Sequence, residues 1–351
     1  MNLRSKYEPP VPAVVLAEGA FGTPDGKTAN GVVVHSELFD ARAVVDSHHA
    51  GRSAGDILAR PSVPNVPVVD SADAALEAAP DAEVLILGAA PAGGCLPEEW
   101  DGDIREAMAA GCDVISGLHV FLSEDAEWRS LADQHEVRIV DVRKPPAEAD
   151  LQVADGELDV DADVVLVMGT DCAVGKRTTT FELYAAACDR GLDAAWVATG
   201  QTGIMVGAHR GVVVDRVPAD FAAGVVEEMV RALGDRDVVF VEGQAALTHR
   251  AYGGVTLSIL GGTWPDAVVL TDDPDRQGRE HFESQTIPTA EEEASVVEAL
   301  SDAAVVAIST WGDPDEVAYD LDCPAVNVYH DGGPAALLDV VADAIGRGDA
   351  P

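Results

Sequence analysis

The sequence predicts an α/β protein built from two parallel-sheet domains. Short apolar runs, such as 83–88 and 237–242, alternate along all 351 residues with segments of helical length. Glycine-rich loops follow several of these runs directly, as they do where a buried strand turns into a helix. A stretch rich in proline and acidic residues, 143–162, shows no periodicity. We therefore expect one domain over 1–147, a linker over 148–162 and a second domain over 163–351.

The first half has the alternation of a Rossmann-like domain, because strands that alternate with helices form parallel sheets with helices on both faces. Strands are expected at 13–19, 31–35, 43–46, 66–70, 83–88, 113–116 and 137–142, and helices at 72–79, 98–110 and 124–135. The dinucleotide fingerprint G-x-G-x-x-G is absent after the first strand. Two strand-end loops, 88–94 and 116–119, would lie at the ligand-binding edge of the sheet. Either they contact a ligand, or their glycines simply turn the chain.

The second half opens with a strand, a loop bounded by glycines, and a helix. The apolar run 163–168 leads into Gly169, five residues separate Gly169 from Gly175, and Lys176 and Arg177 follow. In such a loop the backbone N–H groups and the positive end of the helix face an anion, and the lysine reaches over it. The standard P-loop has four residues between its glycines, and a Ser or Thr after its lysine binds Mg²⁺. The sequence therefore predicts a phosphate site of unusual spacing, with an ordinary strand-to-helix turn as the alternative.

The remaining elements complete a P-loop NTPase-like parallel-sheet domain. Further strands are expected at 194–198, 237–242, 267–271, 305–310 and 325–329. Helices are expected at 176–190, 290–300 and 334–346, and another helix is expected to end at Leu233. Residues 199–203 (Thr-Gly-Gln-Thr-Gly) are expected to form a second glycine-rich loop at a strand end. The strand 237–242 ends in Glu242, which has the place of a Walker-B carboxylate beside the phosphate loop.

Composition and charge narrow the possible functions. The formal net charge is −40 and only four lysines occur, so a nucleic-acid partner, which needs the opposite charge, is not expected. Such uniform acidity is typical of halophilic cytoplasmic proteins, which stay soluble in concentrated salt. No run reaches the roughly 18 apolar residues of a membrane span, and the polar, proline-rich N-terminus lacks the apolar core of a signal peptide. We therefore expect a cytoplasmic protein without a membrane partner, with five scattered cysteines as reduced thiols.

The loop resembles the phosphate loop of dethiobiotin synthetases. The resemblance is carried by Gly169-Thr170-Asp171-x-x-Val174-Gly175-Lys176, by Val241-Glu242-Gly243, and by Asp215 in Val214-Asp215-x-Val217-Pro218. That family has a hydroxyl at the position of Arg177, where it helps to place Mg²⁺. An arginine cannot bind a metal and adds a positive charge, so the departure favours an anion bound without a metal.

From about residue 10 to 300 the chain resembles a two-domain family with a Rossmann-like N-terminal half and a P-loop C-terminal half. Besides the phosphate loop, the motifs that carry this resemblance are Gly88-x-Ala90-Pro91-Ala92-Gly93-Gly94, Ser116-Gly117-Leu118-His119-x-Phe121-Leu122, Asp141-Val142-Arg143-x-Pro145-Pro146, Thr199-Gly200-Gln201-Thr202-Gly203 and Val241-Glu242-Gly243-Gln244. Members of that family include D-glutamate N-acetyltransferases. The resemblance thus implies transfer of acetyl from acetyl-CoA, as cosubstrate, to the amine of a D-amino acid, in the first place D-glutamate. Lys176 and Arg177 could hold the 3′-phosphate or pyrophosphate of coenzyme A directly.

Candidate site residues follow from these motifs. The cofactor-binding candidates are Gly169, Thr170, Asp171, Cys172, Ala173, Val174, Gly175, Lys176, Arg177, Thr178 and Thr179. The catalytic candidates are Glu242, Asp215, His249 and Arg250. Glu242 could deprotonate the amine, or only bond a neighbouring loop; His249 could be a base, and Arg250 could clamp a substrate carboxylate. Cys172 is either a packed small side chain or an acetyl carrier, and no metal-ligand set is expected.

Two other functions stay open at this point. One is an ATP-dependent ligase or carboxylase like dethiobiotin synthetase, which would require Mg²⁺ with ATP. The other is a non-catalytic nucleotide-binding regulator, because P-loops serve many functions. A two-domain enzyme of this size is also expected to form a homo-oligomer.

Overall fold

The computed structural model divides the chain into two compact units. It describes residues 1–60, 63, 65–89, 91–279, 282, 284–317 and 319–348. The first unit comprises Met1–Pro145 and Gln201–Val213, and the second comprises Pro146–Gly200 and Val214–Pro351. Among the described residues, no helix combines the length and the apolar character that crossing a membrane requires.

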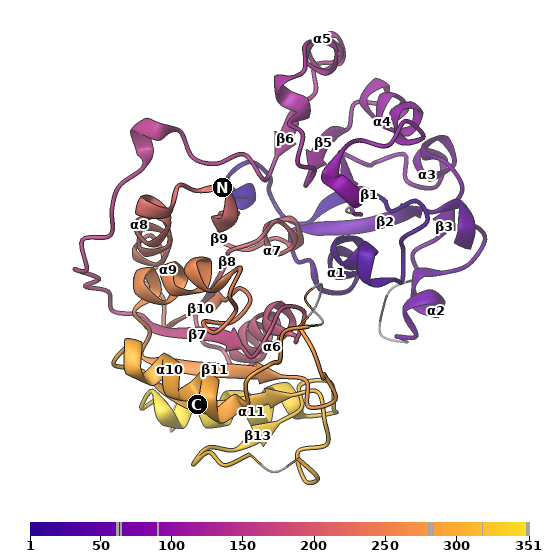
Figure 1. Cartoon of the computed structure of the whole chain (residues 1–351). Helices are drawn as coiled ribbons and strands as arrows, with labels where there is room; N and C mark the ends of the chain where they lie inside the picture. The colour runs from indigo at the N-terminus through magenta and orange to yellow at the C-terminus, as the bar shows by residue number, and fades with distance from the viewer. Residues whose placement is uncertain are drawn as a thin grey trace. The chain divides into compact units, whose positions relative to one another are not determined.

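The first unit is built on a parallel sheet (Figure 1), whose strands lie in the order β3-β2-β1-β4-β5-β6. Its strands are β1 (Val11–Leu16), β2 (Phe39–Val45), β3 (Val68–Val69), β4 (Val84–Leu87), β5 (Asp113–Ser116) and β6 (Ile139–Asp141). Its helices are α1 (Lys27–His35), α2 (Ala54–Leu58), α3 (Ala72–Ala78), α4 (Trp100–Ala109), α5 (Ala126–His135) and α7 (Gln201–Val206), and the short strand β9 is Arg210–Gly211. This strand order is that of a Rossmann fold, which confirms the predicted fold class.

One core of the first unit lies where α3, α4 and α5 pack on the sheet. Leu85, Leu87 and Val114 from the strands meet Trp100 and Ile104 of α4, and all five side chains are at most 3% exposed. Strands buried on both faces carry continuous apolar runs, which is why the sequence shows these strands clearly.

The second unit contains a parallel sheet (Figure 1), in which the strands lie in the order β13-β12-β11-β7-β10-β8. The strands are β7 (Asp163–Gly169), β8 (Ala194–Ala198), β10 (Val238–Glu242), β11 (Ala267–Asp272), β12 (Ala304–Thr310) and β13 (Ala325–Val326). The helices are α6 (Lys176–Asp189), α8 (Ala219–Arg231), α9 (Gly253–Thr263), α10 (Ala290–Leu300) and α11 (Gly333–Ala344). Helix α6 packs against α11, and α8 packs against α9. The central strand β7 therefore delivers its loop to the carboxyl edge of the sheet, between β10 and β11.

Two segments differ from the sequence prediction. Residues 31–35 were expected as a strand but lie in α1, because the segment continues a helix that starts at Lys27 and buries Val32 and Val33. A short apolar run cannot be assigned to strand or buried helix by periodicity alone. The expected loop 199–203 also becomes helical from Gln201 onward, and helix α9 was not expected.

Helix α7 also explains why the compact units differ from the predicted domain division, which placed all of 163–351 in one domain. It packs against α1 within the first unit, where the Thr202 hydroxyl lies 3.0 Å from the Thr28 hydroxyl and both side chains are buried. The Arg143 guanidinium donates to the Gln201 side-chain oxygen at 2.9 Å. The segment thus returns to the first unit before the chain re-enters the second unit at Val214.

Candidate functional site: an anion cradle on strand β7

The loop after β7 has the backbone shape of a phosphate cradle. Ala173 and Gly175 have positive φ angles of 51° and 101°, so the chain turns sharply before α6 begins at Lys176. Gly169 permits a close approach at the other end of the loop. A Cβ atom there would lie 2.5 Å from the Thr271 hydroxyl and 3.2 Å from the Lys176 ammonium. These two glycines therefore allow the loop to wrap around the lysine.

Lys176 is buried at the centre of this loop. Its side chain is held by a hydrogen bond from Nζ to the backbone carbonyl of Asp171, and the residue is 7% exposed. Burial lowers its pKa to about 8, although the charges of Cys172, Asp171, Glu242 and Glu293 act in the opposite direction. An ammonium in this position gains stability from any further negative charge that reaches it.

Two arginines that the sequence analysis did not identify donate hydrogen bonds to the loop. Arg276 donates to the carbonyls of Cys172 at 2.7 Å and Ala173 at 3.3 Å. Arg279, which is 2% exposed, donates to the Thr170 carbonyl at 3.3 Å and to the Asp171 carboxylate at 3.1 Å. Loop carbonyls bound in this way point toward the arginines, not toward a bound anion. Both arginines follow β11 at a strand end, which is the signal that could have identified them.

Arg279 also connects the cradle to the loop after β10. Its second Nη donates to the Thr248 hydroxyl at 2.9 Å, and that hydroxyl donates to the Glu293 carboxylate at 2.6 Å. Glu293 lies in the first turn of α10, is fully buried, and also accepts from the backbone N–H of Leu247 and Thr248. Burial raises the pKa of Glu293, and its hydrogen bonds act against that shift. The loop that carries His249 is thereby fixed beside the cradle.

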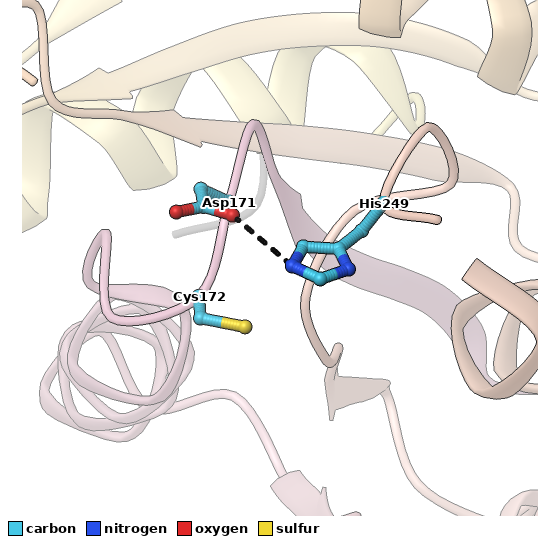
Figure 2. A group of neighbouring side chains, drawn as sticks. All are labelled: Asp171, Cys172 and His249. Carbon is cyan, nitrogen blue, oxygen red and sulfur yellow. Dashed lines mark ion pairs between the residues drawn. The ribbon is translucent and has the colours of Figure 1, made fainter. Parts of the chain in front are cut away.

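Figure 2 shows three neighbouring side chains of the site, those of His249, Asp171 and Cys172. The His249 ring is 1% exposed, stacks on Tyr252 and meets the edge of Phe282. Its Nδ1 accepts two backbone N–H bonds at 3.2 Å, from residues 251 and 252. The neutral imidazole therefore carries its proton on Nε2. Burial lowers the pKa of His249, which favours this neutral form.

The His249 Nε2–H faces Asp171 and Cys172. The Nε2 atom lies 3.9 Å from Asp171 Oδ1, too far for a hydrogen bond, and it has no hydrogen-bond partner among the residues that the structure describes. A ring nitrogen of His249, a carboxylate oxygen of Asp171 and the Cys172 sulfur all lie within 4.8 Å of one another. Proximity of this kind is compatible with a metal ion, but a metal would have to replace the proton on Nε2. The Asp171 carboxylate already faces the Arg276 and Arg279 guanidiniums, so a metal ion at Asp171 would compete with these two cations.

Of the other three predicted catalytic residues, one lies beside the cradle and two are exposed. Glu242 ends β10 with 6% exposure and interacts electrostatically with Lys176 and Arg177. Asp215 lies in the short 3-10 helix Val214–Arg216 and is exposed, and Arg250 is exposed. The structure thus groups Glu242 and His249 with the cradle and places Asp215 and Arg250 at the surface.

The predicted motifs of the first unit meet at the edge of its own sheet. The backbone N–H of His119 donates to the Gly94 carbonyl at 2.9 Å, which joins the two strand-end loops, while Ala90 of the first motif lies outside the described residues. Asp141 accepts from the backbone N–H of Leu122 and Ser123 at 3.1 and 2.8 Å. These contacts assign the motif residues a role in holding the loops. At the same sheet edge a cavity of about 360 Å³ has a mainly acidic lining: Glu18, Gly19, Ser47, His48, Asp70, Glu99 and Asp103.

Comparison with known proteins covers both units. Residues 47–145 match the Rossmann-like domain of DUF1611, and residues 152–338 match its P-loop domain; both are described as domains of unknown function. The crystal structure of a DUF1611 family protein from Anabaena variabilis superposes with a TM-score of 0.82 at 31% identity, over 95% of this chain and 99% of that one.

Two relatives have a named activity. A protein of Tritonibacter scottomollicae named D-glutamate N-acetyltransferase is 33% identical over 276 residues, which is 74% of this chain and 81% of the relative. A protein of the same name from a Pseudoalteromonas species is 36% identical over 190 residues, which is 54% of this chain and 56% of the relative.

Proposed function

We propose that this chain, which belongs to the two-domain DUF1611 family, is an N-acetyltransferase that moves acetyl from acetyl-CoA to the amine of D-glutamate. The observation that carries the proposal is a phosphate cradle whose lysine is followed by Arg177 in place of a metal-binding hydroxyl. Relatives named for this activity support the reaction class. The donor and the amino acid are our inference from the cradle and from those names.

The cradle suits a phosphorylated carrier bound without a metal ion. Lys176 and Arg177 begin helix α6, where the helix dipole already favours negative charge. Burial lowers the pKa of Arg177, while Glu242 and Tyr329 act in the opposite direction, and the guanidinium stays charged. Coenzyme A presents a pyrophosphate and a 3′-phosphate, and two adjacent cations can bind such groups by charge-assisted hydrogen bonds.

Acetyl transfer requires a neutral amine, a donor for the thioester oxygen as it gains charge, and a proton for the leaving thiolate. We assign the first task to Glu242, which would take a proton from the substrate ammonium directly or through a water. The amine nitrogen then attacks the thioester carbon and the carbon–sulfur bond breaks. The thiolate of coenzyme A takes up the second proton that the nitrogen loses as the amide forms. His249 is assigned as a hydrogen-bond donor through Nε2 and not as a base, because its Nδ1 lone pair accepts backbone N–H groups.

A direct transfer fits the loop better than an acetyl-cysteine intermediate. Cys172 lies inside the loop that would grip phosphate, whereas the pantetheine arm of coenzyme A holds the thioester away from its phosphates. The nearby His249 Nε2 carries a proton and cannot take one from the thiol. Both observations favour a complex in which donor and amino acid are bound together.

The test is release of free thiol from acetyl-CoA in the presence of D-glutamate, in molar KCl and without divalent cations. We expect turnover with D-glutamate and little with L-glutamate. If no acidic amino acid gives thiol release and ATP gives Mg²⁺-dependent release of ADP, the ligase alternative replaces the proposal. A thermal-shift comparison of acetyl-CoA and Mg-ATP separates the two ligands independently, because a ligand of the native state raises its stability.

Glu242→Gln tests the assigned base. If Glu242 accepts the amine proton, kcat falls by about 100-fold or more and the acidic limb of the pH–rate profile is lost, with the KM for acetyl-CoA nearly unchanged. If the carboxylate only balances the charges of Lys176 and Arg177, the substitution changes the KM for acetyl-CoA and leaves kcat intact. That second outcome would remove Glu242 from the mechanism.

A further inference from the structure

Two exposed aromatic side chains lie beside the cradle. Trp311 directly follows β12, and Tyr329 lies just after β13, so both belong to the carboxyl edge of the sheet that carries the phosphate loop. Each is 44% exposed, and their rings meet edge to face with centroids 5.7 Å apart. Aromatic residues make up only 5% of the chain, and an exposed pair of them is a feature that requires an explanation.

The pair touches the last residue of the loop. A Cβ atom placed on Gly175 would lie 2.6 Å from Trp311 Nε1 and 3.4 Å from the Tyr329 hydroxyl. The polar edges of both rings therefore adjoin the N-terminus of α6, where a phosphate would bind.

Buried contacts fix the two rings in this position. The Asn327 amide, 5% exposed, donates to the carbonyls of Trp311 at 3.2 Å and Gly312 at 3.0 Å, and its oxygen accepts from the Tyr329 N–H at 2.9 Å. One side chain thus holds both aromatic segments, with its donor and its acceptor groups satisfied.

Asp272 joins the aromatic pair to the cradle. Its carbonyl accepts from the Trp311 N–H at 3.0 Å, and its carboxylate accepts from the Thr170 hydroxyl at 2.7 Å. The carboxylate also accepts from the Tyr319 hydroxyl at 3.0 Å. Loop and aromatic pair are therefore parts of one hydrogen-bonded assembly.

We propose that Trp311 and Tyr329 form a stacking site for the adenine base of a ligand whose phosphates bind the cradle. This inference rests on the proposed function in one respect, since coenzyme A is such a ligand. A flat base joined to phosphate groups would use the ring face and the cradle together. Pyrophosphate alone, which has no base, would use only the cradle.

Calorimetric titration of the full chain in molar KCl tests the site with three probes: coenzyme A, adenosine 3′,5′-bisphosphate and pyrophosphate. Trp311→Leu removes the aromatic face but keeps an apolar side chain. We expect it to weaken binding of the two adenine probes by about 10-fold and to leave pyrophosphate unchanged. Trp311→Phe, which restores a ring, should recover most of the lost affinity.

Trp264→Leu is the matched control. Trp264 is 51% exposed and precedes β11, so it lies at the opposite edge of the parallel sheet from the cradle. This variant should bind all three probes like the unaltered protein. Equal weakening of all three probes by Trp311→Leu, no weakening of any, or no binding of any probe to the unaltered chain would each overturn the stacking site. If the exposed pair binds a macromolecule instead, Trp311→Leu weakens the binding of none of the three probes.

The acetyl-transfer assay separates this inference from the proposed function. Acetyl transfer combined with adenine binding that is insensitive to Trp311→Leu refutes the stacking site and leaves the acetyltransferase proposal standing. Adenine binding that depends on Trp311, without acetyl transfer to any acidic amino acid, supports the stacking site and refutes the acetyltransferase proposal.

Discussion

Lys176 should make the binding of acetyl-CoA weaken as the pH rises above about 8. Burial lowers the pKa of its ammonium from 10.5 to about 8, and the charges of Cys172, Asp171, Glu242 and Glu293 limit that shift. A phosphate bound over the ammonium adds negative charge and raises its pKa again. By linkage, the ligand then binds the protonated lysine more tightly than the neutral one.

The two pKa values set the size and the sign of this effect. If bound phosphate restores the ordinary value of 10.5, the affinity falls about 10-fold per pH unit between pH 8 and 10.5, about 300-fold in all. The stability of the ligand-free protein changes with pH in the opposite direction. In this window the unfolded state holds more protons on Lys176 than the native state, so the free energy of unfolding rises with pH, by up to about 3 kcal/mol. Lys176→Met removes both slopes.

Calorimetric titration with acetyl-CoA from pH 7 to 10.5 measures the binding slope. The ligand itself does not titrate there, because it has no free thiol and the second pKa of a phosphate monoester is about 6. Thiols do titrate in this window, with an ordinary pKa of about 8.5, so the series is run on a Cys172→Ala background. Lys144→Met, at an exposed lysine of the first unit, is the control for a lost surface charge. An affinity that stays flat to pH 10, or that falls equally in Lys176→Met, would refute the reasoning.

Three further substitutions give distinct outcomes. Arg279→Ala leaves a buried carboxylate without its main partner and should lower the free energy of unfolding by about 3 kcal/mol in chemical denaturation, whereas exposed Arg250→Ala should change it little. Gly175→Ala places a methyl group 2.6 Å from the Trp311 ring nitrogen at a φ of 101°; we expect a loss of about 1–3 kcal/mol of stability and loss of detectable acetyl-CoA binding by calorimetry. Cys172→Ala should keep kcat within about 3-fold in the thiol-release assay. Abolished turnover with intact acetyl-CoA binding would instead indicate an acetyl-cysteine intermediate.

The sequence was sufficient for the fold because buried parallel strands leave continuous apolar runs. The runs at β4, β7 and β10 place the strands that carry both domains, and comparison confirms the predicted two-domain family and its fold class. The prediction was wrong at 31–35. This valine run favours a strand, but it lies in the buried helix α1, which packs against α7. Such contacts come from residues about 170 positions away and leave no local signal.

The candidate site was only half visible in the sequence for the same reason. Glycine spacing and a following lysine identify the cradle locally, since backbone shape depends on adjacent residues. Arg276 and Arg279 bind that loop from a segment about 100 residues downstream, and arginines at strand ends are common. Trp311 carries no motif at all, and only its position beside Gly175 marks it as a candidate for ligand binding.

The hydrogen-bond partners of three acidic side chains support our proposal that the cradle binds an anion without a metal. Asp171 pairs with Arg279, and Asp272 accepts from two hydroxyl groups. Glu293 accepts from the backbone and hydroxyl of the loop that carries His249. A divalent cation in the cradle would have to draw these carboxylates away from donors that they already satisfy, and would leave those donors buried and unpaired. A phosphate group makes no such demand, because it would meet the Lys176 ammonium and the N-terminus of α6 while these three carboxylates keep their partners.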